Sequence, residues 1–185
     1  MFINKTKNIF KFIKSNKNLF LVVIIPLIIF LSLFPRSVDV LNQNPIFGFD
    51  QGREMLAAKN IVINHKLILI GTELGAGVAG ISGIFQGPVY YYLLTIPFVL
   101  FNGNPVGGVL MMLAFSLLTI LFGFYVGKKL FGAKYGILVA LLISISPVLI
   151  SQARFTWSPN LSTLFILLSF YFTYLLFKKR NLYVF

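Results

Sequence analysis

The sequence predicts an all-α protein that crosses a membrane about five times. Of its 185 residues, 58% are hydrophobic and only 11% are charged, and the mean hydropathy of +0.90 exceeds that of soluble domains. The apolar residues fall in blocks of about 20, the length that a helix needs to cross roughly 30 Å of hydrocarbon. The blocks lack the alternation of apolar and polar residues typical of a barrel strand, so helices are the expected elements.

Cysteine content and net charge exclude several classes of function. Without any cysteine, the chain can form neither disulfide bonds nor thiolate metal sites. The formal net charge is +12, yet the basic residues flank the hydrophobic blocks and no nucleic-acid-binding motif is present. We therefore attribute the basic residues to membrane topology and expect no nucleic-acid partner.

The first transmembrane helix is expected at residues 19–35. It follows a basic segment, residues 1–18, which by the positive-inside rule places the N-terminus in the cytoplasm next to anionic lipid. We interpret the apolar run as a permanent anchor, because it is longer than a typical signal-peptide core and no small-residue cleavage site follows it. Pro26 is expected to kink this helix.

A large extracytoplasmic loop, residues 36–87, is expected next. Residues 50–66 have a helical composition with apolar side chains along one side, which predicts a short amphipathic helix on the membrane surface. Residues 71–87 are rich in glycine and are expected to form a pliable loop. This segment holds all four acidic residues of the chain, Asp39, Asp50, Glu54 and Glu73.

Four further transmembrane helices are expected within residues 88–178, and a basic tail, residues 179–185, follows them. Strict alternation would place Lys128, Lys129 and Lys134 outside, whereas the positive-inside rule favours the cytoplasm for them. Two explanations are open: a weak segment such as residues 61–85 also enters the membrane, or the folded outer loop overrides the rule. The expected helices cover about residues 88–101, 105–126, 135–150 and, after a polar interruption at 151–160, the stretch up to 178.

Glycines recur at a spacing of four or five residues around the predicted third and fourth helices. Small residues at such a spacing let helix backbones approach one another closely in a membrane. They predict close packing of these two helices. The residues are Gly123, Gly127, Gly132 and Gly136.

The candidate catalytic group is a set of charged residues in the outer loop. Asp50, Arg53 and Glu54 stand at positions i, i+3 and i+4, so a helix would carry them on one face. Such a group can accept a proton, bind a divalent cation or hold a phosphate. The structural alternative is that Asp50 caps the helix and that Arg53 and Glu54 are solvated surface charges. Asp39 and Glu73 are expected to be peripheral.

Arg154 is the second candidate, and His65 is expected to be structural. A charged side chain within residues 151–160 is costly unless it reaches the membrane interface or a partner. Arg154 therefore has either a functional role or a snorkelling role, in which Trp157 would anchor the helix end. Signatures of soluble enzymes, such as a GxxxxGK[ST] phosphate loop or an HExxH zinc helix, are missing, and His65 is the only histidine.

Three motifs follow one another in an order that resembles a known enzyme family. They are FGFDQGRE at residues 47–54, FQGPVYYY at 85–92 and SQARFTWSPN at 151–160. With the basic turn at 127–132, they resemble the N-terminal part of a polyprenyl-phosphate-dependent glycosyltransferase of the GT-C class. The similar branch contains protein O-mannosyltransferases and the lipid A aminoarabinose transferase, in which an acidic motif follows the first span and a Gly-Pro-aromatic motif opens the second. The likeness covers about residues 45–170.

The resemblance assigns the chemistry to the first of these motifs. It implies that Asp50 is the catalytic outer-loop aspartate, which acts as the general base or as a ligand of a divalent cation, the one cofactor that it suggests. Glu54 would assist Asp50. Arg53 and Arg154 would neutralise the phosphate of the donor as it leaves.

The second motif supplies substrate-binding residues in this comparison. The resemblance places Gln86 and Tyr90 among them. Relatives often carry histidine at the position of Gln86 and an acidic residue near Asn160, so this chain departs from the family pattern at both positions.

The resemblance implies a multi-pass cell-membrane enzyme that moves a sugar, with inversion, from a polyprenyl-phosphate-linked donor to an extracytoplasmic acceptor lipid, glycan or protein. Members have many more spans and usually a further soluble portion. We therefore expect this chain to be an N-terminal part with little activity alone. The alternative from another class is a non-catalytic multi-span assembly partner or small transporter subunit, in which the acidic residues would tolerate alanine and the glycine spacings would matter more because they set helix contacts. Membrane lipid is an expected partner in either case.

Overall fold

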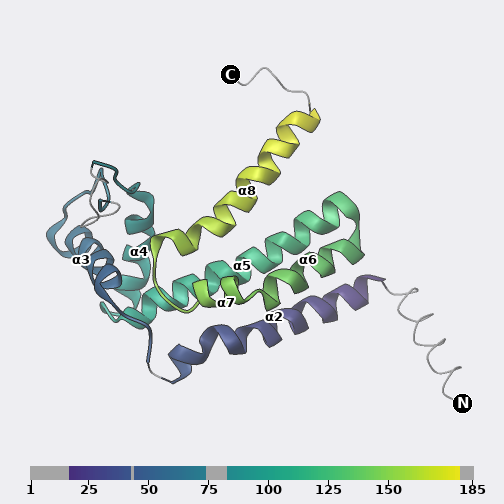
Figure 1. Ribbon diagram of the computed structural model, residues 1–185, viewed down its shortest axis with the longest axis horizontal. Helices are drawn as coiled ribbons and strands as arrows, with labels where there is room; N and C mark the ends of the chain where they lie inside the picture. Colours follow the sequence, from purple (N-terminus) through teal and green to yellow (C-terminus); the bar gives the residue numbers. More distant parts are fainter. Residues whose placement is uncertain (1–16, 43, 74–82, 180–185) are drawn as a thin grey trace, which may run out of the picture.

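The computed structural model describes residues 17–42, 44–73 and 83–179, and these ranges are largely helical (Figure 1). This confirms the predicted all-α class for the described part of the chain. Most of the predicted basic segments, at both ends, and residues 74–82 of the glycine-rich stretch lie outside the described residues. The helices are α2 (Lys17–Leu41), α3 (Phe49–Asn64), α4 (Val89–Leu100), α5 (Pro105–Phe131), α6 (Ala133–Ile145), α7 (Pro147–Gln152) and α8 (Ser158–Lys179).

Helix α2 extends beyond the first predicted span. It ends at Leu41 rather than at residue 35, and it contains both Pro26 and Pro35. A proline removes one backbone donor and favours a helix end. Here the following turn is held by other helices, because the side chain of Arg36 is fully buried and hydrogen-bonded to α5 and α6. The last turns of α2 therefore belong to a helix and not to the outer loop.

Three helices, α2, α5 and α8, are long and apolar enough to cross a membrane, and α4 and α6 are shorter apolar helices. Helices α5 and α6 form a tight antiparallel hairpin (Figure 1). A Cβ atom on Gly136 would lie 2.7 Å from the backbone oxygen of Phe124, and one on Gly127 would lie 3.0 Å from the Cα atom of Gly136. Only glycine permits this approach, so the predicted close packing is confirmed for this pair.

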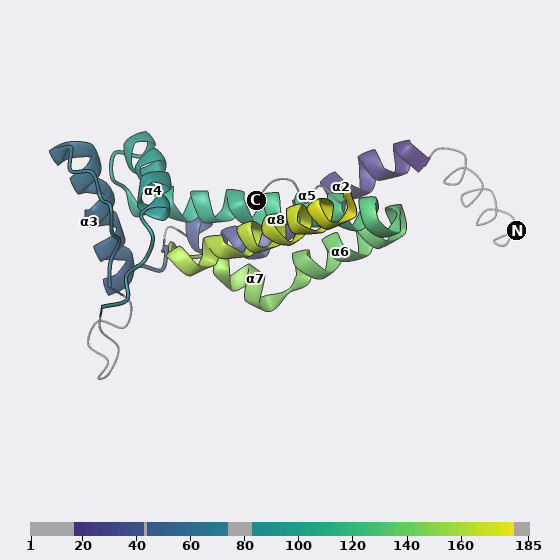
Figure 2. The ribbon, with the colours of Figure 1, turned by 90° about the horizontal axis from the view of Figure 1, so that it is seen from above.

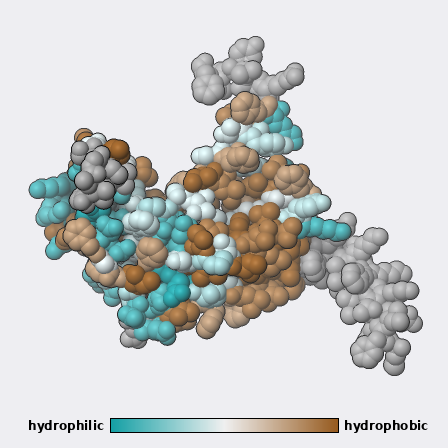
Figure 3. Space-filling model, in the orientation of Figure 1, coloured by the Kyte–Doolittle hydropathy of each residue, from teal (hydrophilic) through white to brown (hydrophobic). Residues whose placement is uncertain are grey.

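Two apolar clusters hold the helices together. One joins α2, α5 and α6 in the bundle, and the other joins α3 and α4 to α5 and α8. Figure 3 shows hydrophobic side chains over the bundle and polar ones gathered toward the α3 end. The second cluster therefore attaches the polar end of the molecule to the bundle. The buried members of the first cluster are Ile25, Ile28, Ile120 and Ala140, and those of the second are Met55, Ala58, Tyr90, Tyr91, Leu94, Met112 and Leu161.

The helix predicted at residues 88–101 is present as α4, and its membrane crossing stays a prediction. Helix α4 has 12 residues, packs against α3 at one end of the bundle, and lies across the direction of α5 in both views (Figures 1 and 2). A helix of this length reaches only about 18 Å, less than the roughly 30 Å of a hydrocarbon core. A turn with positive φ at Asn102 and Gly103 then starts α5 from the same end of the bundle.

The directions of the helices place the lysines at their ends away from α3. Helices α2 and α6 run toward the α3 end, and α5 and α8 run away from it (Figure 1). The last turns of α5 and α8 and the first turn of α6 therefore carry their lysines away from the α3 end (Figure 1). These lysines therefore lie away from α3 and α4, which is the arrangement that the positive-inside rule favours if the α3 end is extracytoplasmic. The lysines are Lys128, Lys129, Lys134 and Lys178.

Candidate active site at the α3 end of the bundle

Helix α3 presents Asp50 in its first turn. The backbone N–H of Gly48, just before the helix, donates to the side-chain oxygen of Gln51 at 2.9 Å. Asp50 follows within the first turn, where a negative charge interacts favourably with the unpaired N–H groups of the helix start. The helix predicted from residue 50 onward is confirmed.

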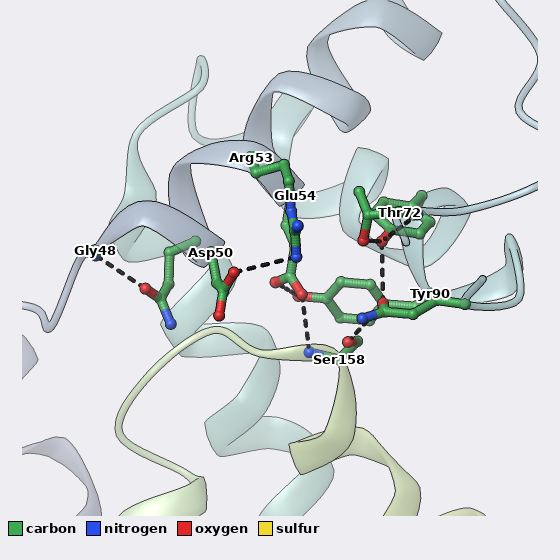
Figure 4. A network of polar contacts seen from close by, with 10 residues as sticks. Gly48, Asp50, Arg53, Glu54, Thr72, Tyr90 and Ser158 are labelled. Carbon is green, nitrogen blue, oxygen red and sulfur yellow. Dashed lines mark hydrogen bonds and ion pairs between the residues drawn. The ribbon is translucent and has the colours of Figure 1, made fainter. Parts of the chain in front are cut away.

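Asp50 and Arg53 form an ion pair at the surface. The Nη2 atom of Arg53 donates to Oδ1 of Asp50 at 3.1 Å, and the two side chains are 28% and 46% exposed, respectively (Figure 4). The Nε atom of Arg53 is buried and has no hydrogen-bond partner among the described residues. The exposed part of the guanidinium carries further N–H donors beside the one that Asp50 receives, and these donors could bind an anion.

Glu54 contacts different elements from Asp50. Its side chain is fully buried, and its two carboxylate oxygens accept from the Tyr90 hydroxyl at 2.7 Å and from the Ser158 backbone N–H at 3.2 Å (Figure 4). Ser158 is the first residue of α8 and Tyr90 lies in α4, so this carboxylate links α3, α4 and α8. The alternative that Glu54 is a solvated surface charge is wrong.

The protonation of this contact follows from its burial. Burial raises the pKa of Glu54 above its ordinary value, and the hydrogen bonds from Tyr90 and Ser158 offset part of the rise. Burial also raises the pKa of the Tyr90 hydroxyl, and the neighbouring carboxylate adds to that rise. Tyr90 therefore keeps its proton and acts as the donor.

Gln86 belongs to a second polar network beside Glu54. Its side-chain oxygen accepts from the Ser158 hydroxyl at 2.8 Å and from the Tyr91 hydroxyl at 3.0 Å. The Tyr91 hydroxyl also contacts the hydroxyl of Thr72 at 2.6 Å, and the backbone of Gln86 pairs with Gly71 and Thr72. The Gly-Pro-aromatic motif thus meets the start of α8 through Gln86.

Arg154 is bound to an acidic side chain of α2. Its Nε and Nη2 atoms donate to the two carboxylate oxygens of Asp39, each at 2.7 Å. Asp39, expected to be peripheral, thus lies outside the group formed by Asp50, Arg53 and Glu54 but binds the second candidate, Arg154. Glu73 instead accepts from the backbone N–H of Gly83 at 2.7 Å in an exposed position.

Sequence reasoning missed Ser158, Tyr91 and Asp39 as members of these networks. Ser158 had a recognisable signal, because serine followed by proline is typical of a helix start. No local pattern pairs Asp39 with a residue 115 positions later. His65 ends α3 at a φ of 52°, at the opposite end of that helix from Asp50.

Asp50 is the predicted metal ligand. Within the described ranges, no group of three or more histidine, aspartate or glutamate side chains is placed to hold a metal ion. A cation at Asp50 would therefore take further oxygen ligands from a bound phosphate or water, as Mg²⁺ commonly does.

An apolar groove of about 350 Å³ lies between α4 and α5. Both helices contribute to it, and Phe115, on its α5 side, also lines a small cavity against α7 and α8. The α4 side of the groove begins at Leu93, three residues after Tyr90. Among its lining residues are Leu93, Ile96, Leu100, Leu110 and Met111.

Comparison with protein families gives one match. The family model described as dolichyl-phosphate-mannose-protein mannosyltransferase matches residues 86–185, from Gln86 through α8. The comparisons with curated proteins and with solved structures found no match. The matched region contains both partners of Glu54, Tyr90 and Ser158, while α3 itself precedes it.

Proposed function

Because this chain belongs to the dolichyl-phosphate-mannose-protein mannosyltransferase family, whose members are membrane glycosyltransferases of the GT-C type, we propose that its α3 end serves sugar transfer from a polyprenyl-phosphate donor. The family and the three long apolar helices together indicate an integral membrane protein. The acceptor would be a lipid, glycan or protein hydroxyl on the side of the membrane that α3 faces. We place that side outside the cytoplasm, because the described lysine clusters lie at the opposite end.

The pairing of Asp50 with Arg53 is the observation that carries this proposal. A partly exposed carboxylate stands beside a guanidinium that has an unpaired buried donor. In the proposed reaction the acceptor oxygen forms a bond to the anomeric carbon, its proton passes to Asp50, and the bond to the phosphate oxygen breaks with inversion. Arg53 would stabilise the negative charge that develops on the departing phosphate.

The other predicted residues receive narrower roles. Glu54 would assist Asp50 indirectly, by fixing α3 against Tyr90 and Ser158, because its own oxygens are buried. Arg154 would offer the phosphate only the donors that Asp39 does not use. If a divalent cation takes part, Asp50 would be its protein ligand, and the phosphate would supply further oxygens.

The Gly-Pro-aromatic motif and the apolar groove after it would hold the donor. Gln86 and Tyr90 would shape the sugar-binding side through the networks that they form with Ser158 and Glu54. The apolar groove between α4 and α5 would accommodate part of the polyprenyl chain, since its lining is almost entirely apolar.

The test is transfer from a labelled polyprenyl-phosphate sugar by the full-length protein with Asp50→Asn. Loss of a general base typically lowers the rate by about 100-fold to 10,000-fold. The matched control is Glu73→Gln, which removes a carboxylate in the exposed loop. If Asp50→Asn and Glu73→Gln transfer sugar equally fast, Asp50 is not the base, and the non-catalytic assembly or transporter role becomes the better account.

A further inference from the structure

The last turns of α2 carry a buried cation that the proposed reaction does not use. The side chain of Arg36 is fully buried, and it lies in a helix apolar enough to cross a membrane. Among the residues that the structure describes, its hydrogen-bond partners are neutral groups on α2, α5 and α6. A buried charge in a membrane helix is costly, so a residue of this kind usually has a specific role.

Arg36 binds the break between α6 and α7. Its guanidinium donates to the backbone oxygens of Ser144 at 2.7 Å and Ile143 at 3.0 Å, and to the hydroxyl of Ser116 on α5 at 3.0 Å. Pro147, the first residue of α7, has no N–H, so the Ile143 carbonyl lacks the partner that a continuous helix would supply. Arg36 satisfies these carbonyls and places positive charge at the negative end of α6.

Asp39, about one turn further along α2, binds the other end of the same segment. Its carboxylate receives both hydrogen bonds from Arg154, which lies two residues after the end of α7. The short helix α7 (Pro147–Gln152) therefore lies between two contacts from a single helix. Arg36 binds Ile143 and Ser144 before α7, and Asp39 binds Arg154 after α7.

The segment beyond Arg154 contacts the candidate active site. Phe155 forms a backbone bridge with Ile46, which precedes α3, and Ser158 donates to Glu54 within α3. The stretch from residue 143 to residue 158 is thus fixed by α2 on one side and supports α3 on the other. A shift of this stretch would move α3 relative to the bundle.

We propose that Arg36 and Asp39 are positioning residues, which hold the segment 143–158 against α2 and thereby place the Asp50–Arg53 pair for transfer. Neither residue touches the substrate. The catalytic consequence rests on the proposed function, whereas the structural contact does not. In this account Arg154 acts chiefly as the partner of Asp39, and Arg53, the partner of Asp50, is the guanidinium that faces the donor phosphate.

Distance measurements between spin labels test the structural part. The protein contains no cysteine, so labels can be attached to the pair Phe30→Cys on α2 and Val148→Cys on α7, whose side chains are 70% and 64% exposed. We expect one narrow distance distribution in the otherwise unchanged protein. Arg36→Met and, independently, Asp39→Asn should each broaden or shift it, and Arg36→Lys should restore part of the narrow distribution.

Ser37→Ala is the matched control, because the Ser37 hydroxyl bonds only to backbone oxygens of α2 itself. It should leave the distribution unchanged. If Arg36→Met does not fold, Asp39→Asn still tests the contact. The Arg154 side chain is 34% exposed, so the loss of its ion pair leaves it accessible to water and should not prevent folding. An unchanged distribution in Asp39→Asn would overturn the proposal.

Transfer rates test the catalytic part. Displacement of catalytic groups by about 1 Å can lower the rate about 100-fold, so Arg36→Met should reduce kcat by this order while the KM for the donor stays close to that of the wild type. Ser37→Ala should keep its kcat. A broadened distance distribution with normal kcat would overturn the positioning role. If the full-length wild-type protein lacks transfer activity, the proposed function is contradicted, and the distance measurements alone test the contact of α2 with segment 143–158.

Discussion

The hydroxyl of Tyr90 donates a hydrogen bond of 2.7 Å to the fully buried carboxylate of Glu54, which ties α4 to α3. Tyr90→Phe would leave one carboxylate oxygen buried without this donor, at a cost of about 1–3 kcal/mol. We expect a lower midpoint of thermal unfolding in detergent, followed by the fluorescence of Trp157, the only tryptophan. Tyr135→Phe changes an exposed ring and should leave the midpoint unchanged. Equal midpoints for both variants would show that the contact contributes nothing.

The same contact predicts a pH dependence of stability. Burial raises the pKa of Glu54 in the folded protein above its ordinary value of 4.5, so the folded state binds a proton more tightly than the unfolded state. The contribution of Glu54 to the free energy of unfolding is therefore greatest below pH 4.5 and decreases as the pH rises through the raised pKa. Glu54→Gln cannot ionise and should lack this decrease. The free energy of unfolding should be measured at a series of pH values for the wild type and for Glu54→Gln. If it changes with pH in the same way in both proteins, the raised pKa of Glu54 is contradicted.

The position of α4 predicts the membrane topology. An impermeant maleimide should label Leu56→Cys in α3 and Leu100→Cys at the end of α4 from the same side of the membrane, and Phe131→Cys at the end of α5 from the other side. All three side chains are at least 60% exposed, and the absence of native cysteine removes background labelling. Labelling of Leu56→Cys and Leu100→Cys from opposite sides would show that α4 crosses the membrane.

Close packing of α5 against α6 predicts sensitivity at Gly136. A Cβ atom at this position would lie 2.7 Å from the Phe124 carbonyl oxygen and 2.9 Å from the Lys128 nitrogen, and backbone atoms cannot move aside as a flexible side chain can. Gly136→Ala should lower the free energy of unfolding by about 1–3 kcal/mol. Gly87→Ala is the control, because no atom lies within 4 Å of its added Cβ. Similar unfolding free energies for the two variants would contradict the close approach.

Local patterns were sufficient to predict several parts of this structure. The charge spacing and composition after residue 49 predicted α3, and the glycine spacing predicted the close pairing of α5 and α6. The pairing of Asp50 with Arg53 also follows from their separation by three residues on a helix. In each case the information lies within one or two turns of the chain.

Long-range contacts account for what the sequence alone did not predict. Pro35 suggested a helix end, but contacts of Arg36 with residues of α5 and α6 continue α2 to Leu41. The apolar run of α4 matched a membrane span, yet its short length and its packing on α3 place it across the end of the bundle. The buried contacts of Glu54 were not predicted, because its partners, Tyr90 and Ser158, lie 36 and 104 residues further along the chain.

Chemical rescue tests whether the carboxylate of Asp50 takes the acceptor proton. Asp50→Ala should lower the transfer rate by about 100-fold or more, and added formate should restore part of that rate, because a free carboxylate can then act as the base in the vacated space. Formate should not accelerate the Arg53→Ala variant, in which the base is still present. A rate of Asp50→Ala that is close to that of the wild type, or one that formate leaves unchanged, would contradict the account.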